Sequence, residues 1–468
     1  MMENRSTRSA KKTVTKMVPA ILTALMATAV GFLALYTSPV PMIQDFGKML
    51  TIGMVVSFIV GLFILIPILF TRDHFFIKSI KKNGKAKLEH SKVERVFGTL
   101  TNLIIKLKWL ILFIAIVTAT AGIWGDLNTG VETDVETFMP QDTQELEDIH
   151  KLRDILGTTD QVSIMYSTDN VLDEETLEWT EELTASLPQE FPSVVVDTNS
   201  LSALLKQANK GEMPDQEETA DILSDMPEEQ LKLFVNEERD SAVLNVGIEH
   251  LEAEEMQDFI AGMKAYISKD TPEGIDAIVT GKSVLDVEMV TALTTGRYKM
   301  TLLGMGLVFM VLLLIYRHPV KAFIPLLPIL FIVGWSGGIM YLFDINYTPL
   351  TATLGALIIG IGTEFTILIM ERFYEERRKG TERREAIMIA NQKIGKAIFA
   401  SAFTTIGGFS ALLVSDFVIL SNFGMMTLVN ISFALISTII VLPAILMLFD
   451  RFVQIKGGEE RGSDTVLG

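Results

Sequence analysis

Residues 28–49 read TAVGFLALYTSPVPMIQDFGKM, and residues 405–426 read TIGGFSALLVSDFVILSNFGMM. At a constant offset of 377 residues, the Gly-Phe pair at 31–32 aligns with the Gly-Phe pair at 408–409. The same offset matches ten further residues in and around the first segment with identical residues: Lys16, Ala20, Ile21, Thr28, Ala34, Leu35, Ser38, Phe46, Gly47 and Met49. We interpret the two segments as one membrane hairpin that has been duplicated.

The second copy of this hairpin ends a much longer unit than the first. Residues 393–449 follow several other apolar runs, whereas residues 16–70 follow only a short basic segment. The prolines that close the copies, Pro67 and Pro443, are 376 residues apart, which indicates a slip of one residue between them. We therefore expect a two-repeat protein whose first repeat lacks its front part.

The composition is that of a membrane protein. Hydrophobic residues make up 49% of the chain, and the mean hydropathy is +0.37. A helix needs about 20 apolar residues to cross a bilayer core, and eight runs reach or approach that length: 17–36, 47–70, 109–125, 298–316, 319–341, 348–372, 396–414 and 421–449. The first run continues into a tight hairpin, so we do not interpret it as a cleavable signal peptide. The sequence predicts a polytopic α-helical membrane protein with about eight transmembrane helices.

The net charge of −17 combines two opposed regions. Residues 126–297 hold 40 of the 57 acidic residues but only 10 of the 40 basic ones, which gives −30 there and +13 elsewhere. The basic residues cluster at 1–16, 71–108 and 372–396, all on one side of the predicted spans. By the positive-inside rule this side is cytoplasmic. We expect a multi-pass cell-membrane protein with both termini in the cytoplasm and residues 126–297 outside it.

These observations divide the chain into seven parts. They are a cytoplasmic N-terminus at 1–16, a transmembrane hairpin at 17–70, a basic cytoplasmic linker at 71–108, a span at 109–125, an extracytoplasmic domain at 126–297, a five-helix bundle at 298–450 and a cytoplasmic tail at 451–468. The chain has no cysteine, no phosphate-binding loop and no Cys/His metal motif. We expect no cofactor, no metal, no enzyme activity and no nucleic-acid partner.

The acidic domain alternates short β-rich and helical segments. Strands are expected at 161–167, 194–197, 241–248 and 277–281, and helices at 173–187 and 253–268. Two successive β-α-β units predict an α+β ferredoxin-like domain, with inserted helices at about 200–235. Its many acids have no catalytic or metal-binding spacing, so we interpret them as a solvated surface.

One predicted span, TPLTATLGALIIGIGTEFTILIMER at 348–372, carries an acid far from both ends. Glu364 lies about 14 residues, or roughly 21 Å of helix, from Leu350 and about 8 residues from Arg372. A charged carboxylate at such depth costs about 3 kcal/mol, so we expect Glu364 to be protonated or paired. We interpret it as a cation- or proton-coupling group. The alternative is a structural acid that bonds to a neighbouring helix.

Several hydroxyl groups could support Glu364. Thr363 precedes it, Thr404 and Thr405 lie in the middle of the span at 396–414, and Thr28 is the counterpart of Thr405 in the first hairpin. Each could bond to the carboxylate or to a carbonyl of its own helix. Three glycines on the Glu364 span would let other helices approach closely: Gly355, Gly360 and Gly362.

The chain resembles a known transporter family. The segment TATLGALIIGIGTEFTILIMERFYEERRKG at 351–380 and the hairpin FASAFTTIGGFSALLVSDF at 399–417 resemble the resistance–nodulation–division (RND) superfamily, in particular its MMPL-like hydrophobe/amphiphile-efflux branch. So do ETDVETFMPQD at 132–142 and YRHPVKAFIPLLPILFIVGW at 316–335. Family members have two repeats, each with one span, a porter domain and five spans. The resemblance makes 109–449 a complete second repeat and 17–70 the last two spans of a first.

This resemblance implies secondary transport of hydrophobic or amphiphilic molecules such as lipids, driven by a proton or sodium gradient through alternating access. In the family, spans four and ten carry coupling acids, often beside a tyrosine. Glu364-Phe365 stands at the tenth-span position but lacks the aromatic hydroxyl. The implied partners are membrane lipids or a lipophilic cargo, protons or sodium ions, and a missing N-terminal half or a second transporter chain. The alternatives are a protein-export accessory subunit, a lipid-sensing or scaffold subunit, and an inactive remnant.

Overall fold

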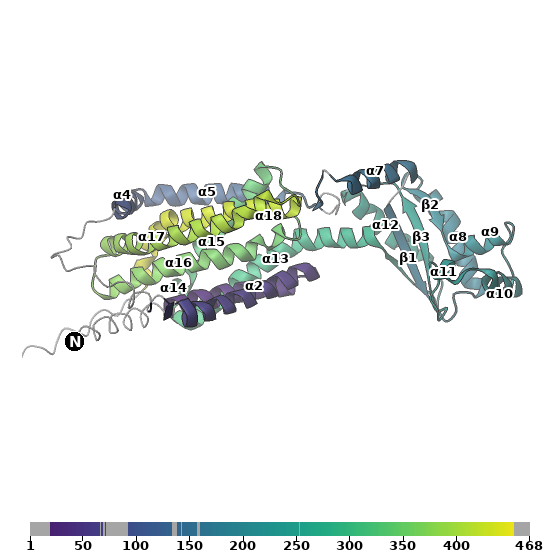
Figure 1. Cartoon of the computed structure of the whole chain (residues 1–468), viewed down its shortest axis with the longest axis horizontal. Helices are drawn as coiled ribbons and strands as arrows, with labels where there is room; N and C mark the ends of the chain where they lie inside the picture. Colours follow the sequence, from purple (N-terminus) through teal and green to yellow (C-terminus); the bar gives the residue numbers. More distant parts are fainter. Residues whose placement is uncertain are drawn as a thin grey trace, which may run out of the picture. The chain divides into compact units, whose positions relative to one another are not determined.

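The chain consists of two compact units. The computed structural model describes residues 19–65, 67–68, 71, 92–132, 138–141, 143–156, 160–251 and 253–453. Met1–Glu132 and Ala292–Gly468 form one unit, here called the spanning unit, and Thr133–Thr291 form the other, here called the α+β unit (Figure 1). The predicted N-terminus at 1–16, most of the predicted linker (72–91) and most of the predicted tail (454–468) lie outside the described residues.

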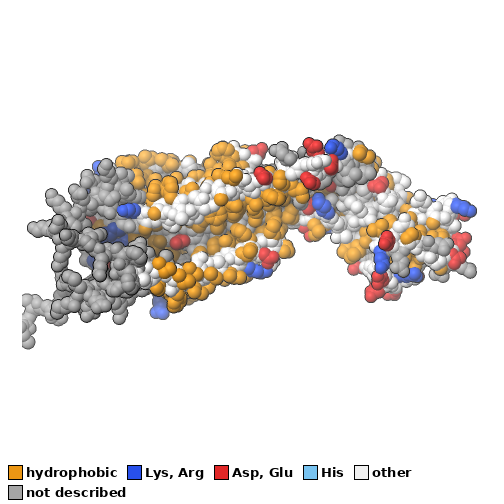
Figure 2. Space-filling view, in the orientation of Figure 1, with side chains coloured by type: hydrophobic (Ala, Val, Ile, Leu, Met, Phe, Trp, Pro, Cys, Tyr) orange, Lys and Arg blue, Asp and Glu red, His pale blue; other side chains and the backbone are white. Residues whose placement is uncertain are grey.

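The eight predicted spans are confirmed. Among the described residues, eight helices are long and apolar enough to cross a membrane: Pro19–Thr37, Pro41–Ile64, Lys108–Leu127, Gly296–Tyr316, Pro319–Leu342, Thr351–Arg378, Arg383–Val414 and Val418–Phe452. Figure 2 shows hydrophobic side chains over much of the visible face of these helices.

The spans are made of α-helices joined by short 3-10 or π-helical segments. Their bounds are η1 (Ala34–Thr37), α2 (Pro41–Val60), the π-helical η2 (Gly61–Leu65), α5 (Lys108–Leu127), α13 (Lys282–Tyr316), α14 (Pro319–Phe323), α15 (Leu326–Leu342), η3 (Thr351–Thr353), α16 (Leu354–Arg378), α17 (Arg383–Phe409), η4 (Ser410–Val414), α18 (Val418–Ile436), the π-helical η5 (Ser437–Val441), α19 (Leu442–Phe449) and η6 (Asp450–Phe452). The helix that precedes η1 begins at Pro19, and we call Pro19–Thr37 the first span.

The centre of the spanning unit is α16. In its most apolar stretch 78% of the residues are buried, against 6% for Pro41–Ile64 and 11% for Arg383–Val414. The prediction that its glycines admit other helices is confirmed. An added Cβ at Gly360 would lie 2.9 Å from Phe32 of the first span, one at Gly362 would lie 3.1 Å from Ile329 of α15, and one at Gly355 would overlap a side chain of α13.

Helices α5 and α15 meet backbone to backbone. An added Cβ at Gly334 would lie 2.5 Å from the carbonyl oxygen of Ala119, and one at Gly338 would lie 2.8 Å from the Cα of Gly122. An added Cβ at Gly122 would overlap the backbone of Gly334. This contact is the small-residue packing by which membrane helices replace a hydrophobic driving force.

The duplicated hairpin has the same structure in both copies. An added Cβ at Gly47 would lie 2.7 Å from the Cβ of Leu35, and one at Gly424 would lie 2.6 Å from the Cβ of Leu412. Both pairs are related by the offset of 377 residues. The π-helical segments η2 and η5 also coincide, at the offset of 376 that the prolines indicate. Identical contacts at identical offsets support a duplication.

A further helix, α4 (Lys92–Lys106), occupies the end of the stretch predicted only as a basic linker. It packs against the first half of α17. Asn391 Nδ2 of α17 donates a hydrogen bond to Thr101 Oγ1 at 3.1 Å and another to the carbonyl oxygen of Ile439 at 3.2 Å. The linker therefore ends in a helix that is fixed to the bundle.

The α+β unit has the predicted ferredoxin-like topology. Its elements are α7 (Gln144–Leu156), β1 (Asp160–Ser167), α8 (Glu174–Glu190), β2 (Val195–Asn199), α9 (Leu201–Ala208), α10 (Gln216–Asp225), α11 (Glu228–Leu231), β3 (Ser241–Ile248), α12 (Ala253–Asp270) and β4 (Asp276–Thr280). The antiparallel sheet has the order β2-β3-β1-β4. Helices α9, α10 and α11 occupy the predicted insertion.

Alternation along the strands explains the core of this unit. Val162, Ile164 and Tyr166 of β1 are buried, while the residues between them are not. Ile164 lies opposite Leu244 of β3 and Val279 of β4. One face of the sheet thus packs against α8 and α12, and these helices supply the remaining core residues.

Candidate functional site

Glu364 faces a groove at the side of α16. Its side chain is exposed, whereas its neighbours Thr363 and Phe365 are buried. The groove has a volume of about 80 Å³ and is lined by Glu364 and Leu368 together with residues of the first span and α2: Ile21, Ala24, Leu25, Thr28 and Met54. No side chain in the described part of the chain forms a hydrogen bond or ion pair with the carboxylate. The sequence predicted that Glu364 would be either protonated or paired inside the bundle. In the described part of the chain it is not paired.

Two of the hydroxyl groups considered above meet beside this groove. Thr28 Oγ1 donates to the carbonyl oxygen of Gly360 at 3.0 Å and lies 3.4 Å from Thr363 Oγ1. Thr363 Oγ1 donates to Gly360 at 2.9 Å and to Ile359 at 2.7 Å. These hydroxyls join the first span to α16 next to Glu364.

The other two hydroxyl groups lie elsewhere. Thr404 Oγ1 donates to the carbonyl oxygen of Ala400 at 2.9 Å, and Thr405 Oγ1 donates to that of Ser401 at 3.0 Å. Thr404 is exposed and Thr405 is half-buried on α17, and neither lines the groove of Glu364. Their hydroxyls are satisfied by their own helix, which is the second of the two arrangements expected from the sequence.

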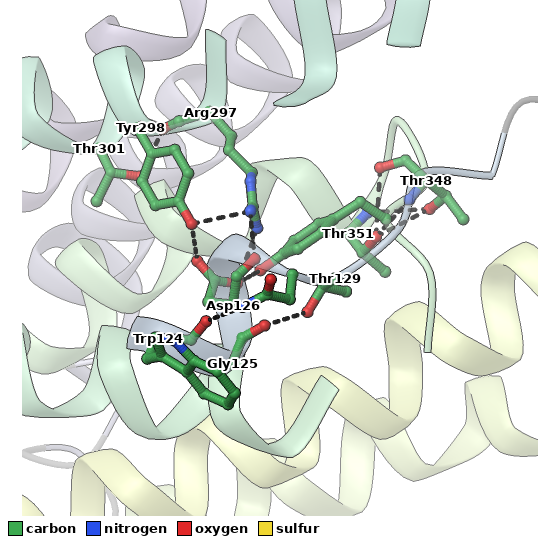
Figure 3. A network of polar contacts seen from close by, with 11 residues as sticks. Trp124, Gly125, Asp126, Thr129, Arg297, Tyr298, Thr301, Thr348 and Thr351 are labelled. Atoms are coloured by element: carbon green, nitrogen blue, oxygen red, sulfur yellow. Dashed lines mark hydrogen bonds and ion pairs between the residues drawn. The ribbon is translucent and has the colours of Figure 1, made fainter. Parts of the chain in front are cut away.

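A second polar site contains a buried ion pair (Figure 3). Arg297 Nη1 donates to Asp126 Oδ1 at 2.9 Å, and Arg297 Nη2 donates to the backbone carbonyl of Asp126 at 2.9 Å. The hydroxyl of Tyr298 donates to Asp126 Oδ2 and that of Tyr347 to Oδ1, both at 2.5 Å. The side chains of Asp126 and Arg297 are only 7% and 8% exposed. A buried pair of this kind is stable only when hydrogen bonds satisfy the remaining polar atoms, and two tyrosines do so for the carboxylate.

Three segments of the spanning unit bring this site together. Asp126 is in the last turn of α5, Arg297 and Tyr298 are on α13, and Tyr347 follows α15. The Arg297 guanidinium lies 3.6 Å from the centroid of the Tyr347 ring, a cation–π contact. Beyond α5, the N–H of Glu132 donates to the carbonyl of Tyr347 at 2.8 Å. This bond also joins the segment after α5 to the segment after α15. The cluster fixes the last turn of α5 to the middle of α13.

The sequence analysis missed this pair because it placed both residues at the borders of the acidic domain, at 126 and 297. In the structure the units divide after Glu132 and after Thr291, so both residues belong to the spanning unit. Charges at the ends of spans are usually solvated. The sequence indicates this pair only by an acid at the end of one span and an arginine at the start of the next.

Ion pairs also gather where α16 ends. Lys321 Nζ lies 2.7 Å from Glu371 Oε1. The side chain of Asp450, which is 1% exposed, is held by Arg383 Nε at 2.8 Å and by Arg377 Nη2 at 3.2 Å. Glu371 and Asp450 are thus paired, as Asp126 is, in contrast to Glu364.

Comparison with known proteins identifies the family. The sequence model of the MMPL family matches residues 140–465. The chain belongs to the MMPL family. A membrane protein of Methanocaldococcus jannaschii is 29% identical over 357 residues, which cover 74% of this MMPL chain and 91% of the relative. The apo-petrobactin exporter of Bacillus anthracis is 26% identical over 187 residues, which cover 38% of the chain and 25% of the exporter.

Solved structures confirm the RND-type fold of this MMPL protein. The hedgehog release protein Disp of the water bear Hypsibius dujardini matches 92% of the chain with a TM-score of 0.64 at 13% identity, and SecDF matches 96% with a TM-score of 0.50 at 14% identity. The chain spans only 58% and 51% of these two proteins. At such low identity the likeness concerns the fold.

Proposed function

We propose that this chain carries out secondary active transport of hydrophobic or amphiphilic molecules such as lipids, driven by a proton or sodium gradient. Membership of the MMPL family supports transport, and one relative is named as an exporter. The opposed charges of the two regions support an orientation with both termini in the cytoplasm and the α+β unit outside.

The observation that carries the proposal is the isolation of Glu364. It is the acid in the middle of α16, the most buried span, and it faces an apolar groove with no partner in the described part of the chain. An uncompensated carboxylate in such a place favours the protonated form, and loss of the proton creates a charge that costs about 3 kcal/mol. A conformational change that hydrates or pairs this charge is therefore coupled to proton release.

Besides α16, the groove is formed by the first span and α2, and the first span is placed to respond to this charge. The first span contacts α16 through the hydrogen bond between Thr28 and Gly360 and through Phe32. A charge at Glu364 therefore acts directly on the contact between the first span and α16. We propose that this contact is the part of the bundle that changes when the ion binds or leaves, with Thr28 and Thr363 as supporting groups.

The test uses everted membrane vesicles that contain the whole chain and a fluorescent amphiphilic dye. We expect uptake when a proton or sodium gradient is imposed and no uptake after an ionophore collapses it. Glu364→Gln, which keeps the shape but cannot ionise, should abolish the gradient-driven uptake. Asp416→Asn, at an exposed acid between η4 and α18, is the matched control and should transport normally.

Either of two outcomes would overturn the proposal. Gradient-driven uptake by Glu364→Gln at the native rate would exclude the role of this residue. Uptake by the native protein that survives the ionophore would exclude coupling to an ion gradient. The thermal stability of each variant shows that a loss of uptake is not a loss of folding.

A further inference from the structure

The spanning unit contains an apolar crevice that is separate from the groove of Glu364 and lies beside the last turn of α5, which also carries Asp126. It has a volume of about 600 Å³, within the range of roughly 300–1,000 Å³ typical of ligand pockets. Residues of α5, α15 and α18 line it, and none of them lines the groove of Glu364. The residues used below are Thr118, Ala121, Trp124, Trp335, Tyr341, Phe433 and Ile436.

The crevice exists because α5 and α18 both pack on α15 but separate from each other. On one side, α5 is held against α15 by the glycine contacts described above. On the other side, Trp335 of α15 packs edge-on against Phe433 of α18, with ring centroids 5.5 Å apart. Past Ile436, α5 packs against η5 and α19, which closes the crevice at one end. The crevice is therefore a wedge with α15 as its floor.

The wall of the crevice offers almost nothing to a polar ligand. Trp335 Nε1 donates to Thr118 Oγ1 at 2.9 Å, and Thr118 Oγ1 in turn donates to the carbonyl of Ile114 at 2.7 Å, so these polar groups are already satisfied. No charged side chain lines the crevice in the described part of the chain. An occupant would gain mainly by burying apolar surface.

The dimensions and the rim match one leaflet of a bilayer. Along α5 the lining extends from Thr118 to Gly125, about 10 Å of helix, which is less than half of a ~30 Å hydrocarbon core. Trp124 and Tyr341 stand at the end of the crevice where α5 and α15 end, with ring centroids 5.9 Å apart. Aromatic pairs of this kind are typical of the membrane–water interface.

We propose that this crevice is a binding site for one acyl chain of a bilayer phospholipid from the leaflet at which α5 ends. Trp124 and Tyr341 flank the ester region of the lipid, and its acyl chain runs over α15 toward Phe433 and Ile436. The bound lipid is a resident part of the bundle that supports α5, and it is distinct from a transported cargo. Because the lining carries no charge, binding depends on the acyl chain and is indifferent to the charge of the headgroup.

The test is photo-crosslinking of the whole chain in nanodiscs. The probe is a phosphatidylcholine with a diazirine in the middle of one acyl chain, and the labelled peptides are identified by mass spectrometry. We expect labels within 118–125, 335–342 or 433–436, and the same pattern with a phosphatidylglycerol probe. Ala121→Phe fills the crevice from an exposed position of α5. It should lower labelling there about tenfold or more, because several methylene groups can no longer be buried.

The matched control is Ile123→Phe, which adds the same ring two residues away on α5 at a side chain that is 43% exposed and does not line the crevice. It should label like the native protein. If Ala121→Phe fails to fold, Ile436→Trp closes the crevice from α18 instead. Labelling spread evenly over all lipid-facing helices, labelling unchanged in the filled variants, or labelling by only the anionic probe would each overturn the proposal.

Discussion

Arg297 donates hydrogen bonds to both the carboxylate and the backbone carbonyl of Asp126, each at 2.9 Å. The chain passes from α5 into the α+β unit soon after Asp126 and returns through α13 shortly before Arg297. The two ends of this long excursion are thus joined inside the spanning unit. Since both side chains are less than a tenth exposed, this pair differs in kind from the ion pairs on the surface.

Removal of one partner of this pair should be strongly destabilising. We expect Asp126→Ala to lower the free energy of unfolding by about 3–5 kcal/mol, because the Arg297 charge is left buried without compensation. The double variant with Arg297→Met should be more stable than Asp126→Ala alone. Denaturant unfolding in detergent of the native protein, Asp126→Ala, Arg297→Met and the double variant gives the four free energies needed for a double-mutant cycle.

The control for this experiment is the exposed pair of Asp45 and Lys48, whose side chains are 68% and 50% exposed. Lys48→Ala should cost no more than about 1 kcal/mol. A cost for Asp126→Ala as small as that of Lys48→Ala would show that the buried cluster contributes little to the fold.

The contact between Gly47 and Leu35 predicts a difference between two glycines of α2. Gly47→Ala should destabilise the protein by about 1–3 kcal/mol, because its Cβ would lie 2.7 Å from that of Leu35. Gly53→Ala, with no atom of the described chain near the added group, should be neutral or stabilising by up to about 1 kcal/mol. Gly424→Ala in the second hairpin should behave like Gly47→Ala. Thermal unfolding measures all three, and equal values for Gly47 and Gly53 would contradict the packing described here.

Thr28 and Thr405 occupy the same position in the two hairpins but should differ in importance. Thr28→Val removes a buried hydrogen bond to α16 and should cost about 1 kcal/mol and slow gradient-driven uptake. Thr405→Val removes only a bond to its own helix. It should change the free energy of unfolding by no more than about 0.5 kcal/mol and leave the rate of gradient-driven uptake unchanged. Equal effects of the two substitutions on uptake would remove Thr28 from the proposed coupling site.

The absence of cysteine from these 468 residues makes a direct test of the Glu364 groove simple. Glu364→Cys should react with a small neutral maleimide about tenfold faster than Leu302→Cys, because thiolate formation needs water and the conformational change proposed above hydrates this groove. Leu302 is 65% exposed on α13 and is a lipid-facing control. Equal rates at the two positions, measured by mass spectrometry after timed quenching, would argue against a hydrated groove.

The sequence predicted the features that depend on local pattern. The eight spans follow from apolar runs of about 20 residues, and the sheet order follows from two β-α-β units with alternating burial in strands such as 161–167. The duplicated hairpin was visible because identical residues recur at one offset, and the contacts of Gly47 and Gly424 repeat with them.

The remaining features depend on the rotation and pairing of helices. The span that holds Glu364 is apolar on all sides, so its pattern does not tell which neighbour the carboxylate faces. Asp126 and Arg297 are 171 residues apart, and neither lies in a motif that links one to the other. Helix α4 was missed because its stretch was interpreted from its positive charge alone.

The ion pair of Asp126 and Arg297 also has a consequence for how such proteins diversify. The α+β unit is an insertion between two chain ends that the spanning unit itself holds together. Its sequence can therefore be lengthened, shortened or exchanged for that of a relative with little effect on the helices that anchor it. A family built in this way can exchange the insert while the membrane-spanning helices are inherited unchanged.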